Sequence, residues 1–311
     1  MRDTKSRPVG IALIQQANLS SDPERNKASL CEAIAGVADN ADFIMPTELS
    51  TTLYLGTVRD RSLEAWAEKA DGPFLTEIGA LASRHKTTIL LPVYLNCGSG
   101  EFANVVVVFG QDGAVVRGQS PRGMSVPHFT KVHLPFAWRD GKGLDEPFYF
   151  RRGDCFPVFQ TPKAKIGILV CYDRRFPEAW RSLALAGAEL VFMPSCVPAW
   201  NPSALSSTAD MFIAELQTRA CENGVFVAAS NRAGKQELGG IETHFIGRSC
   251  LIDPAGGVVA QSLVRESDIV AAEVDLDDVR RVRRRLTLLQ DRQPGAYDLD
   301  VPSLQGQERQ A

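Results

Sequence analysis

Cys171 stands at the end of a short apolar segment, residues 166–170, and is followed directly by Tyr172-Asp173-Arg174-Arg175. A helix is expected from about residue 176, with Pro177 in its first turn. A nucleophile at such a strand-to-helix turn is raised out of the sheet and lies beside free backbone N–H groups. The helix start and the two arginines favour the thiolate form of the cysteine. The alternative is a small hydrophobic core cysteine, since free cysteines are commonly buried.

A thiol nucleophile needs a base, and two kinds of base are open. None of the four histidines lies in an obvious orienting motif, and His133 is the candidate nearest to Lys131. The other possibility is a glutamate base, with a lysine that stabilises the developing oxyanion. Glu48 follows the short apolar run 43–46, which is a natural position for a site residue in an α/β sheet. Spacing alone does not establish that Glu48, Lys131 and Cys171 meet.

Apolar periodicity and turn residues predict the elements that must position these side chains. Strands and helices alternate, with antiparallel hairpins among them, which favours one α/β domain of two packed sheets with helices outside. A long ordered loop is expected over residues 119–145, and an extended polar tail from about residue 294. The expected strands are 9–15, 43–46, 88–95, 104–110, 114–118, 156–159, 165–170, 189–193 and 225–230, followed by a meander of 245–253, 258–262 and 269–274. The expected helices are one that begins at Pro23 and those that span 73–85, 176–186 and 205–222.

The composition argues against several classes of protein. Hydrophobic residues make up 44% and charged residues 23% of the 311 residues, which is ordinary for a globular chain. A net charge of −3 disfavours nucleic-acid binding, and the arginine-rich run 280–285 is expected on a solvated or subunit-facing helix. No apolar run approaches the ~20 residues that span a bilayer, so we expect a cytoplasmic protein without a membrane partner. Seven cysteines without a CxxC pair predict no disulfide scaffold and no metal site.

Three motifs in order make the sequence similar to the carbon–nitrogen hydrolase (nitrilase) superfamily, from Val9 to about Asp298. Pro46-Thr47-Glu48-Leu49 resembles the block around the family's glutamate base. Residues 130–135 resemble its lysine block, and residues 171–178 resemble its nucleophile block. The resemblance implies a four-layer αββα sandwich, with residues 1–311 as a single domain. It further implies a Glu48–Lys131–Cys171 triad that works without a cofactor or metal.

The same resemblance implies further site residues and a quaternary state. Glu146 matches a second glutamate of the family, and burial beside Lys131 would fix that lysine. Lys131 and the backbone N–H of Tyr172 are the expected oxyanion donors. A homodimer or homotetramer is implied, with the C-terminal tail reaching across.

Within the superfamily, several segments are most similar to the N-carbamoyl-D-amino acid amidohydrolases. Residues 173–181 resemble a segment whose paired arginines grip the substrate carboxylate, which predicts Arg174 and Arg175 as ligands. The other interpretation of each arginine is an internal ion pair. Residues 197–202 resemble a second segment, and Asn201 is the predicted substrate contact there. The chain departs from that subfamily at Tyr172 and Cys196, both of which stand where asparagine is usual, so its pocket differs.

The predicted reaction is hydrolysis of an N-carbamoyl amino acid to the amino acid, ammonia and carbon dioxide, through a thioester on Cys171. The arginines favour a small anionic substrate. One alternative keeps the triad but acts on another small carboxylate-bearing amide, as an aliphatic amidase or an ω-amidase. A second alternative is a catalytically silent scaffold that binds a small anion or a partner protein.

Overall fold

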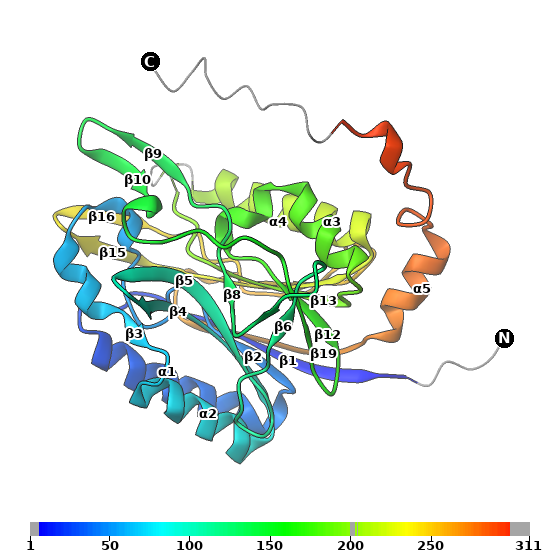
Figure 1. Cartoon of the computed structure of the whole chain (residues 1–311), viewed down its shortest axis with the longest axis horizontal. Coiled ribbons are helices and arrows are strands. Elements are labelled where there is room, and N and C mark those ends of the chain that lie inside the picture. The colour runs from blue at the N-terminus through cyan, green and yellow to red at the C-terminus, as the bar shows by residue number, and fades with distance from the viewer. Residues whose placement is uncertain (1–5, 200–202, 204, 299–311) are drawn as a thin grey trace.

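Two β-sheets packed face to face form the centre of the protein, and helices cover both outer faces (Figure 1). The computed structural model describes residues 6–199, 203 and 205–298. Asn201, the predicted substrate contact, and the tail beyond residue 298 lie outside the described residues. The αββα order predicted from the family resemblance is confirmed, and its two central layers bring distant chain segments together.

The first sheet has seven strands among the described residues, and β1 lies between β19 and β2. β1 pairs in parallel with β2 but antiparallel with β19, so this sheet is mixed. Its strands, in spatial order, are β19 (Asp268–Asp275), β1 (Pro8–Gln15), β2 (Phe43–Met45), β4 (Thr88–Gly98), β5 (Glu101–Phe109) and β8 (Phe129–Thr130), with β3 (Glu68–Lys69) paired to β4.

The second sheet contains the strand that leads to Cys171, and its central strands β12, β13 and β14 are parallel. The two sheets meet through apolar side chains, for example the rings of Phe43 and Phe192, whose centroids are 5.4 Å apart. Its strands, in spatial order, are β18 (Val258–Gln261), β17 (Cys250–Ile252), β14 (Phe226–Asn231), β13 (Leu190–Ser195), β12 (Lys165–Ile168), β11 (Val158–Gln160), β6 (Gly118–Gln119) and β7 (Ser125–Val126).

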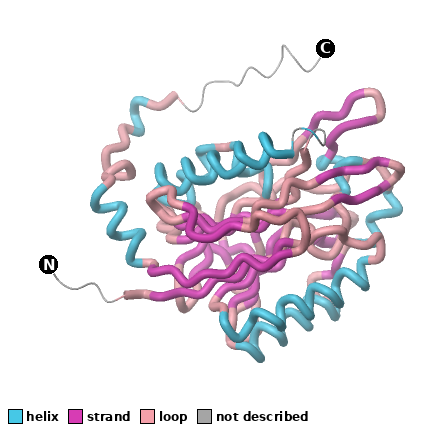
Figure 2. The backbone as a smooth tube through the Cα atoms, turned by 180° about the vertical axis from the view of Figure 1, so that it is seen from behind, coloured by secondary structure: helices cyan, strands magenta, loops and turns pink. Residues whose placement is uncertain are grey.

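Helices close the sandwich on both sides, as Figure 2 shows from behind. α1 (Pro23–Val37) and α2 (Pro73–His85) pack on the outer face of the first sheet, whereas α3 (Pro177–Leu185) and α4 (Leu205–Asn223) cover the second. α1, α2 and α3 each begin with proline, whose fixed φ suits the first helical position. α5 (Asp277–Arg285) follows β19. None of the described helices combines the length and apolar character that a membrane span requires.

Three sequence predictions about local structure are wrong in part. The late meander is broken, because β19 leaves β17 and β18 and pairs along its whole length with β1 of the other sheet. In the predicted strand 114–118, Val115 makes only an isolated bridge, and Gly118 begins β6 in the second sheet. The predicted loop 119–145 contains strands, including the hairpin of β9 (Phe136–Arg139) and β10 (Lys142–Asp145).

A second hairpin, β15 (Lys235–Leu238) and β16 (Ile241–His244), was also missed. The two hairpins stand apart from the main sheets, and their short strands carry no long apolar run that could have predicted them. The site residues lie in the segments that directly follow strands β2, β8, β10 and β12.

Candidate active site

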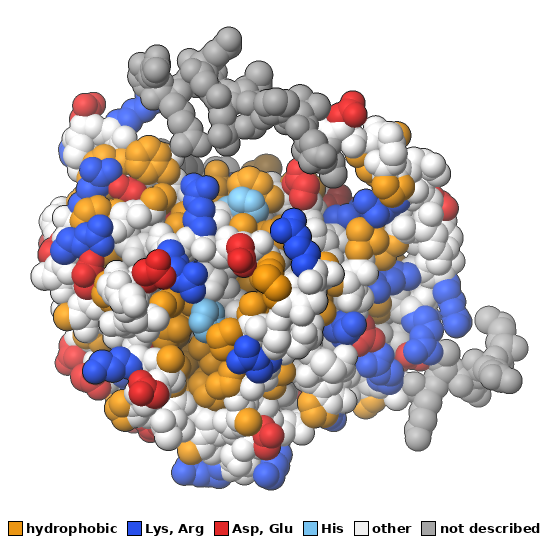
Figure 3. All heavy atoms as spheres, in the orientation of Figure 1, with side chains coloured by type: hydrophobic (Ala, Val, Ile, Leu, Met, Phe, Trp, Pro, Cys, Tyr) orange, Lys and Arg blue, Asp and Glu red, His pale blue; other side chains and the backbone are white. Residues whose placement is uncertain are grey.

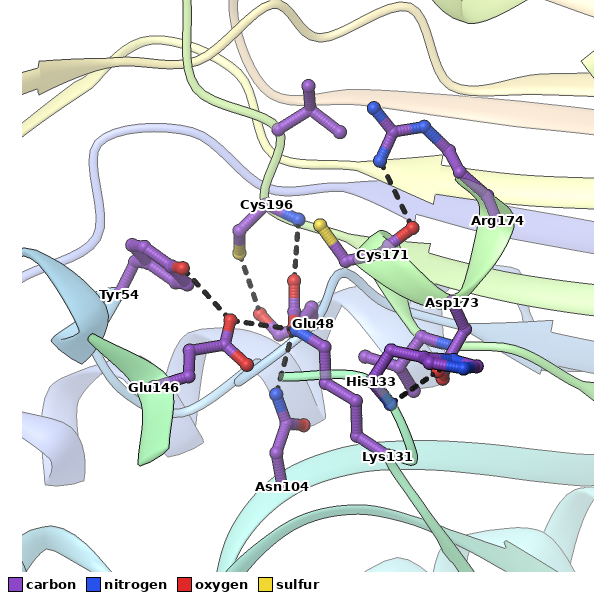
Figure 4. Close-up of polar contacts among 12 residues, drawn as sticks. Glu48, Tyr54, Asn104, Lys131, His133, Glu146, Cys171, Asp173, Arg174 and Cys196 are labelled. Atoms are coloured by element: carbon purple, nitrogen blue, oxygen red, sulfur yellow. Dashed lines mark hydrogen bonds and ion pairs between the residues drawn. The ribbon is translucent and has the colours of Figure 1, made fainter. Parts of the chain in front are cut away.

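Glu48 lies in the turn that follows β2 and is completely buried. Leu49, the next residue, adopts a left-handed conformation with φ of 50°. The Oε1 atom of Glu48 accepts hydrogen bonds from Lys131 Nζ at 2.7 Å and from Asn104 Nδ2 at 2.8 Å. Its Oε2 atom accepts one from the backbone N–H of Cys196 at 2.9 Å. Donors from three other segments therefore fix this carboxylate (Figure 4).

Lys131 follows β8 and is also completely buried. Its Nζ atom lies 2.7 Å from Glu48 and 2.7 Å from Glu146. Burial lowers the pKa of Lys131, but the charges of Glu146 and Glu48 outweigh that effect and hold its pKa above the ordinary value. Lys131 is thus a permanent cation between two carboxylates, which suits a donor to a developing oxyanion.

Glu146 begins a short 3-10 helix, η4 (Glu146–Phe148), directly after β10. Its Oε1 atom accepts hydrogen bonds from Lys131 and, at 2.9 Å, from the hydroxyl of Tyr54. Burial raises the pKa of Glu146 to about 7, against the opposing effect of Lys131. The predicted position of Glu146 beside Lys131 is thus present in the structure.

Cys171 begins η5 (Cys171–Arg175), the turn between β12 and α3. Its φ of 48° is left-handed, a strained conformation for a residue with a side chain. Figure 4 shows its sulfur pointing toward the backbone of Cys196, whose N–H binds the Glu48 carboxylate. The residue is buried, with 8% of its surface exposed, and it belongs to the large apolar core cluster. This geometry is that of a nucleophile presented at a strand-to-helix turn.

The expectation of a resting thiolate at Cys171 is wrong. Burial and the nearby Glu48 carboxylate raise the pKa of the Cys171 thiol to about 12, and Lys131 and Arg174 only partly oppose them. The surroundings of Cys171 therefore favour the neutral thiol over the thiolate.

The backbone N–H groups of Cys171 and Tyr172 make no hydrogen bond within their own turn, η5. Its first hydrogen bond runs from Asp173 N to Val170 O at 3.0 Å, so the N–H groups of Cys171 and Tyr172 precede it. The Asp173 carboxylate ties this turn to the lysine segment, because it accepts hydrogen bonds from Val170 N and from His133 N and Nδ1. The predicted oxyanion donors lie on segments that are linked to one another.

The two arginines predicted as substrate ligands differ in their surroundings. Arg174 is 5% exposed, donates to Cys171 O at 3.0 Å and pairs with Glu215 at 3.1 Å. The side chain of Arg175 is 48% exposed and lies 3.3 Å from the same carboxylate oxygen. Arg174 thus makes the internal contacts of the alternative interpretation, whereas Arg175 keeps part of its guanidinium open to solvent. The ligand roles of both arginines stay predictions.

Sequence reasoning missed several residues of this network. Asn104 and Tyr54 bind the two glutamates, and Arg232 binds the turn that carries Glu48. Asn104 could have been recognised in the sequence, because it is a polar residue inside the apolar strand β5 and a buried polar side chain needs a partner. The backbone N–H of Cys196 has no such signal, since any residue except proline supplies one. Across the described residues, no group of His, Cys, Asp and Glu side chains is arranged to hold a metal ion.

Known proteins resemble the chain over most of its length. The pattern of the carbon-nitrogen hydrolase family matches residues 10–284. An N-carbamoylputrescine amidase of Solanum lycopersicum is 30% identical over 94% of this chain and 95% of its own. The same enzyme of Solanum tuberosum is 38% identical, but the match covers only 54% of this chain and 57% of that relative. A citrullinase of Francisella tularensis is 28% identical over 93% of this chain and 97% of its own.

Solved structures share the fold. A carbon-nitrogen hydrolase of Helicobacter pylori G27 superposes with a TM-score of 0.82, covers 94% of this chain and 97% of its own, and is 24% identical. The family pattern spans the segments that carry Glu48, Lys131 and Cys171. The chain belongs to the carbon–nitrogen hydrolase family of the nitrilase superfamily, and it is a hydrolase of non-peptide C–N bonds.

Proposed function

We propose that the protein hydrolyses the ureido group of an N-carbamoyl amino acid, with Cys171 as nucleophile and Glu48 as general base. The observation that carries this proposal is the buried network in which Lys131 joins Glu48 and Glu146 beside the strained Cys171 turn. A carboxylate, an ammonium and a thiol in this arrangement can attack a planar carbonyl and stabilise the oxyanion that results.

The first chemical step starts from the neutral thiol. Glu48 takes the proton of Cys171 as the sulfur attacks the carbonyl carbon. Lys131 Nζ and the Tyr172 N–H donate to the oxyanion, and each such donor is worth about 3–4 kcal/mol in comparable sites. The tetrahedral intermediate collapses when the C–N bond breaks and the amine leaves with the proton that Glu48 held.

The second step releases the carbamoyl group. Glu48 activates a water that attacks the carbamoyl thioester, and the C–S bond breaks with return of the proton to sulfur. The carbamic acid that forms decomposes to ammonia and carbon dioxide. Glu146 does not exchange protons in this scheme: it fixes Lys131, together with Tyr54.

The substrate class rests on two observations of different kinds. Two relatives are named for N-carbamoylputrescine and citrulline, and both compounds carry a ureido group. Arg175 presents a half-exposed guanidinium four residues after the proposed nucleophile, and such a group can form a bidentate pair with a carboxylate. Citrulline bears such a carboxylate, whereas N-carbamoylputrescine bears an amine.

Glu215 favours a second candidate, an N-carbamoyl amine that carries a positive charge. One of its oxygens lies within 3.3 Å of both Arg174 and Arg175, so it offsets part of their charge. A cationic substrate would meet less repulsion there than at two unpaired arginines. The aliphatic amidase and ω-amidase alternatives keep the same triad and need no ureido group.

A substrate panel separates these candidates. N-Carbamoyl-D-, N-carbamoyl-L- and N-carbamoyl-β-amino acids, N-carbamoylputrescine and simple aliphatic amides would be compared by ammonia release and kcat/KM. The proposal expects the highest kcat/KM for an N-carbamoyl amino acid, and a carbamoyl adduct on Cys171 by mass spectrometry after rapid quenching. Preference for a simple amide, with an acyl adduct instead, would contradict the ureido assignment but leave the nucleophile in place.

The partners and environment of the protein stay proposals. On the face seen in Figure 3, acidic and basic side chains are interspersed over the left and centre, whereas basic side chains gather at the right, where α5 lies. Acidic residues in the first turn of α5 offset part of that charge, and we propose a small-molecule substrate rather than a nucleic acid. A homodimer or homotetramer in the cytoplasm is the proposed state, and sedimentation analysis of the full chain would test the number of subunits.

A further inference from the structure

Arg232 follows β14 and is one of the largest completely buried side chains of the protein. Its guanidinium donates to three carbonyl groups of the segment that follows β2. One terminal nitrogen lies 2.8 Å from Glu48 O and 2.9 Å from Leu49 O, and the other lies 3.0 Å from Thr52 O. Arg232 therefore holds the backbone that carries the proposed base, and it does not contact the Glu48 carboxylate itself.

No carboxylate in the described part of the chain lies within ion-pair distance of this guanidinium. Its Nε atom has no hydrogen-bond partner there, and its guanidinium lies over the ring of Phe245, 5.8 Å from the ring centroid. A buried cation without a counter-ion loses several kcal/mol of hydration. The three carbonyl oxygens offset this loss, and all three lie in the segment that carries Glu48.

The turn that Arg232 holds is strained. Leu49 has a φ of 50°, a region that costs a non-glycine residue about 1–3 kcal/mol. In this conformation the carbonyls of Glu48 and Leu49 converge on one nitrogen of Arg232, and two charge-assisted hydrogen bonds offset the strain. The direction in which the Glu48 side chain leaves the backbone depends on this turn.

The backbone of Arg232 is linked to the same carboxylate by a second route. Arg232 N donates to Ser195 O at 3.0 Å, and the next residue, Cys196, donates its N–H to Glu48 Oε2. Both Arg232 and the strand end at Ser195 therefore connect to Glu48, one through its backbone and the other through its carboxylate.

We propose that Arg232 is a positioning residue for the reaction: it clamps the strained turn at Leu49 and so aims the Glu48 carboxylate at the Cys171 thiol. The proposal rests on Glu48 as the general base. It assigns to Arg232 no contact with substrate.

The test uses alkylation of Cys171 by iodoacetamide, which needs no knowledge of the natural substrate. Rates at Cys171 would be followed by peptide mass spectrometry for the wild type, Arg232→Met, Arg232→Lys and Glu48→Gln over a range of pH. Arg232→Met should slow alkylation about tenfold or more at neutral pH, since a misplaced base loses much of its effect. The rate should then rise more steeply with pH, because the thiol depends on hydroxide. Arg232→Lys, which keeps the charge, should restore part of the rate.

Arg283→Met is the matched control. Arg283 also binds two backbone carbonyls, those of Gly224 and Ala188, but it lies on α5 and outside the site. Its variant should alkylate at the wild-type rate. A wild-type rate and pH profile in Arg232→Met, or an equal loss in Arg283→Met, would overturn the proposal. If Arg232→Met does not fold, Arg232→Lys decides: slower alkylation at an unchanged melting temperature supports the proposal, and an unchanged rate overturns it. An unaffected Glu48→Gln would remove the base assignment itself.

Discussion

Two clusters of charged side chains lie near Cys171, and Figure 4 shows the first of them together with Arg174 of the second. In the first cluster, Glu48 and Glu146 share Lys131, and all three side chains are completely buried. In the second, Arg174 and Arg175 share the carboxylate of Glu215, and Arg175 is half exposed. We refer to these as the acid–lysine cluster and the arginine cluster.

The difference concerns what each cluster can still bind. In the acid–lysine cluster, the named donors from Asn104, Cys196 and Tyr54 fix the carboxylates, so these groups have little freedom to adapt to different ligands. Preorganised groups of this kind stabilise a transition state without reorganising. In the arginine cluster, one guanidinium keeps exposed donors, so a substrate can compete with Glu215 for it. We infer that the first cluster performs chemistry and the second selects substrates.

The largest expected effect is the loss of turnover when Cys171 is replaced, with the fold retained. Cys171→Ala should lower ammonia release by about 10⁴-fold or more, because the covalent route is lost. The melting temperature should stay close to the wild-type value, since only a small sulfur is removed from a strained turn. Cys221→Ala, a change of a free cysteine on α4, is the control and should keep full activity. Substantial turnover in Cys171→Ala would refute the thioester mechanism.

The next change breaks the acid–lysine cluster. Lys131→Met leaves two buried carboxylates face to face, and we expect the free energy of unfolding in urea to fall by about 3–5 kcal/mol. Adding Glu146→Gln removes one of the two charges and should recover part of that loss, whereas turnover should stay absent in both variants. A double variant that is no more stable than Lys131→Met would show that repulsion between the glutamates is not the cause.

The arginine cluster should respond in substrate affinity rather than in stability. Arg175→Gln should raise the KM for an N-carbamoyl amino acid about tenfold with little change in kcat, since one charged contact to the carboxylate is lost. Arg174→Gln should instead lower the melting temperature, because this buried guanidinium supports Cys171 O. An unchanged KM in Arg175→Gln would remove its assigned role. A lower KM for N-carbamoylputrescine in Glu215→Gln would contradict the second candidate function.

Much of the acid–lysine cluster could be predicted from sequence, because each of its main residues lies in a motif. The blocks around Glu48, Lys131 and Cys171 are local patterns, and the resemblance supplied their partnership. The elements that carry them followed from apolar periodicity, as with α2, whose predicted bounds are those observed. Local pattern was sufficient wherever an element is long and half buried.

The rest depends on contacts that leave no local pattern. β19 reads as the last strand of a meander, yet its partner β1 is more than 250 residues away in the chain. The thiolate expected from neighbouring arginines is disfavoured because burial, which sequence does not report, is the largest influence on the pKa of Cys171 and raises it. Arg232 looks like an ordinary surface arginine until its three carbonyl partners are known.

A pH dependence of stability would sharpen the account of Glu146. Its pKa is raised by burial from 4.5 to about 7, so between these values the folded state binds the proton more tightly than the unfolded state. The contribution of Glu146 to stability should therefore fall as pH rises from about 4.5 to about 7. Urea unfolding at pH 5 and pH 8 should show a smaller advantage of wild type over Glu146→Gln at pH 8. The opposite trend would mean that Lys131 outweighs burial.

The smallest expected effect concerns Cys196, which belongs to the acid–lysine cluster through its backbone. Its N–H binds Glu48 Oε2 at 2.9 Å, whereas its thiol only donates to Glu48 O at 3.1 Å, a carbonyl that Arg232 also binds. Cys196→Ala keeps the N–H and removes a weak sulfur donor, so kcat should change by less than about threefold. Steady-state ammonia release would measure this. A loss of a hundredfold would mean that the thiol, and not only the amide, places the base, because the clamp of Arg232 alone would then be insufficient.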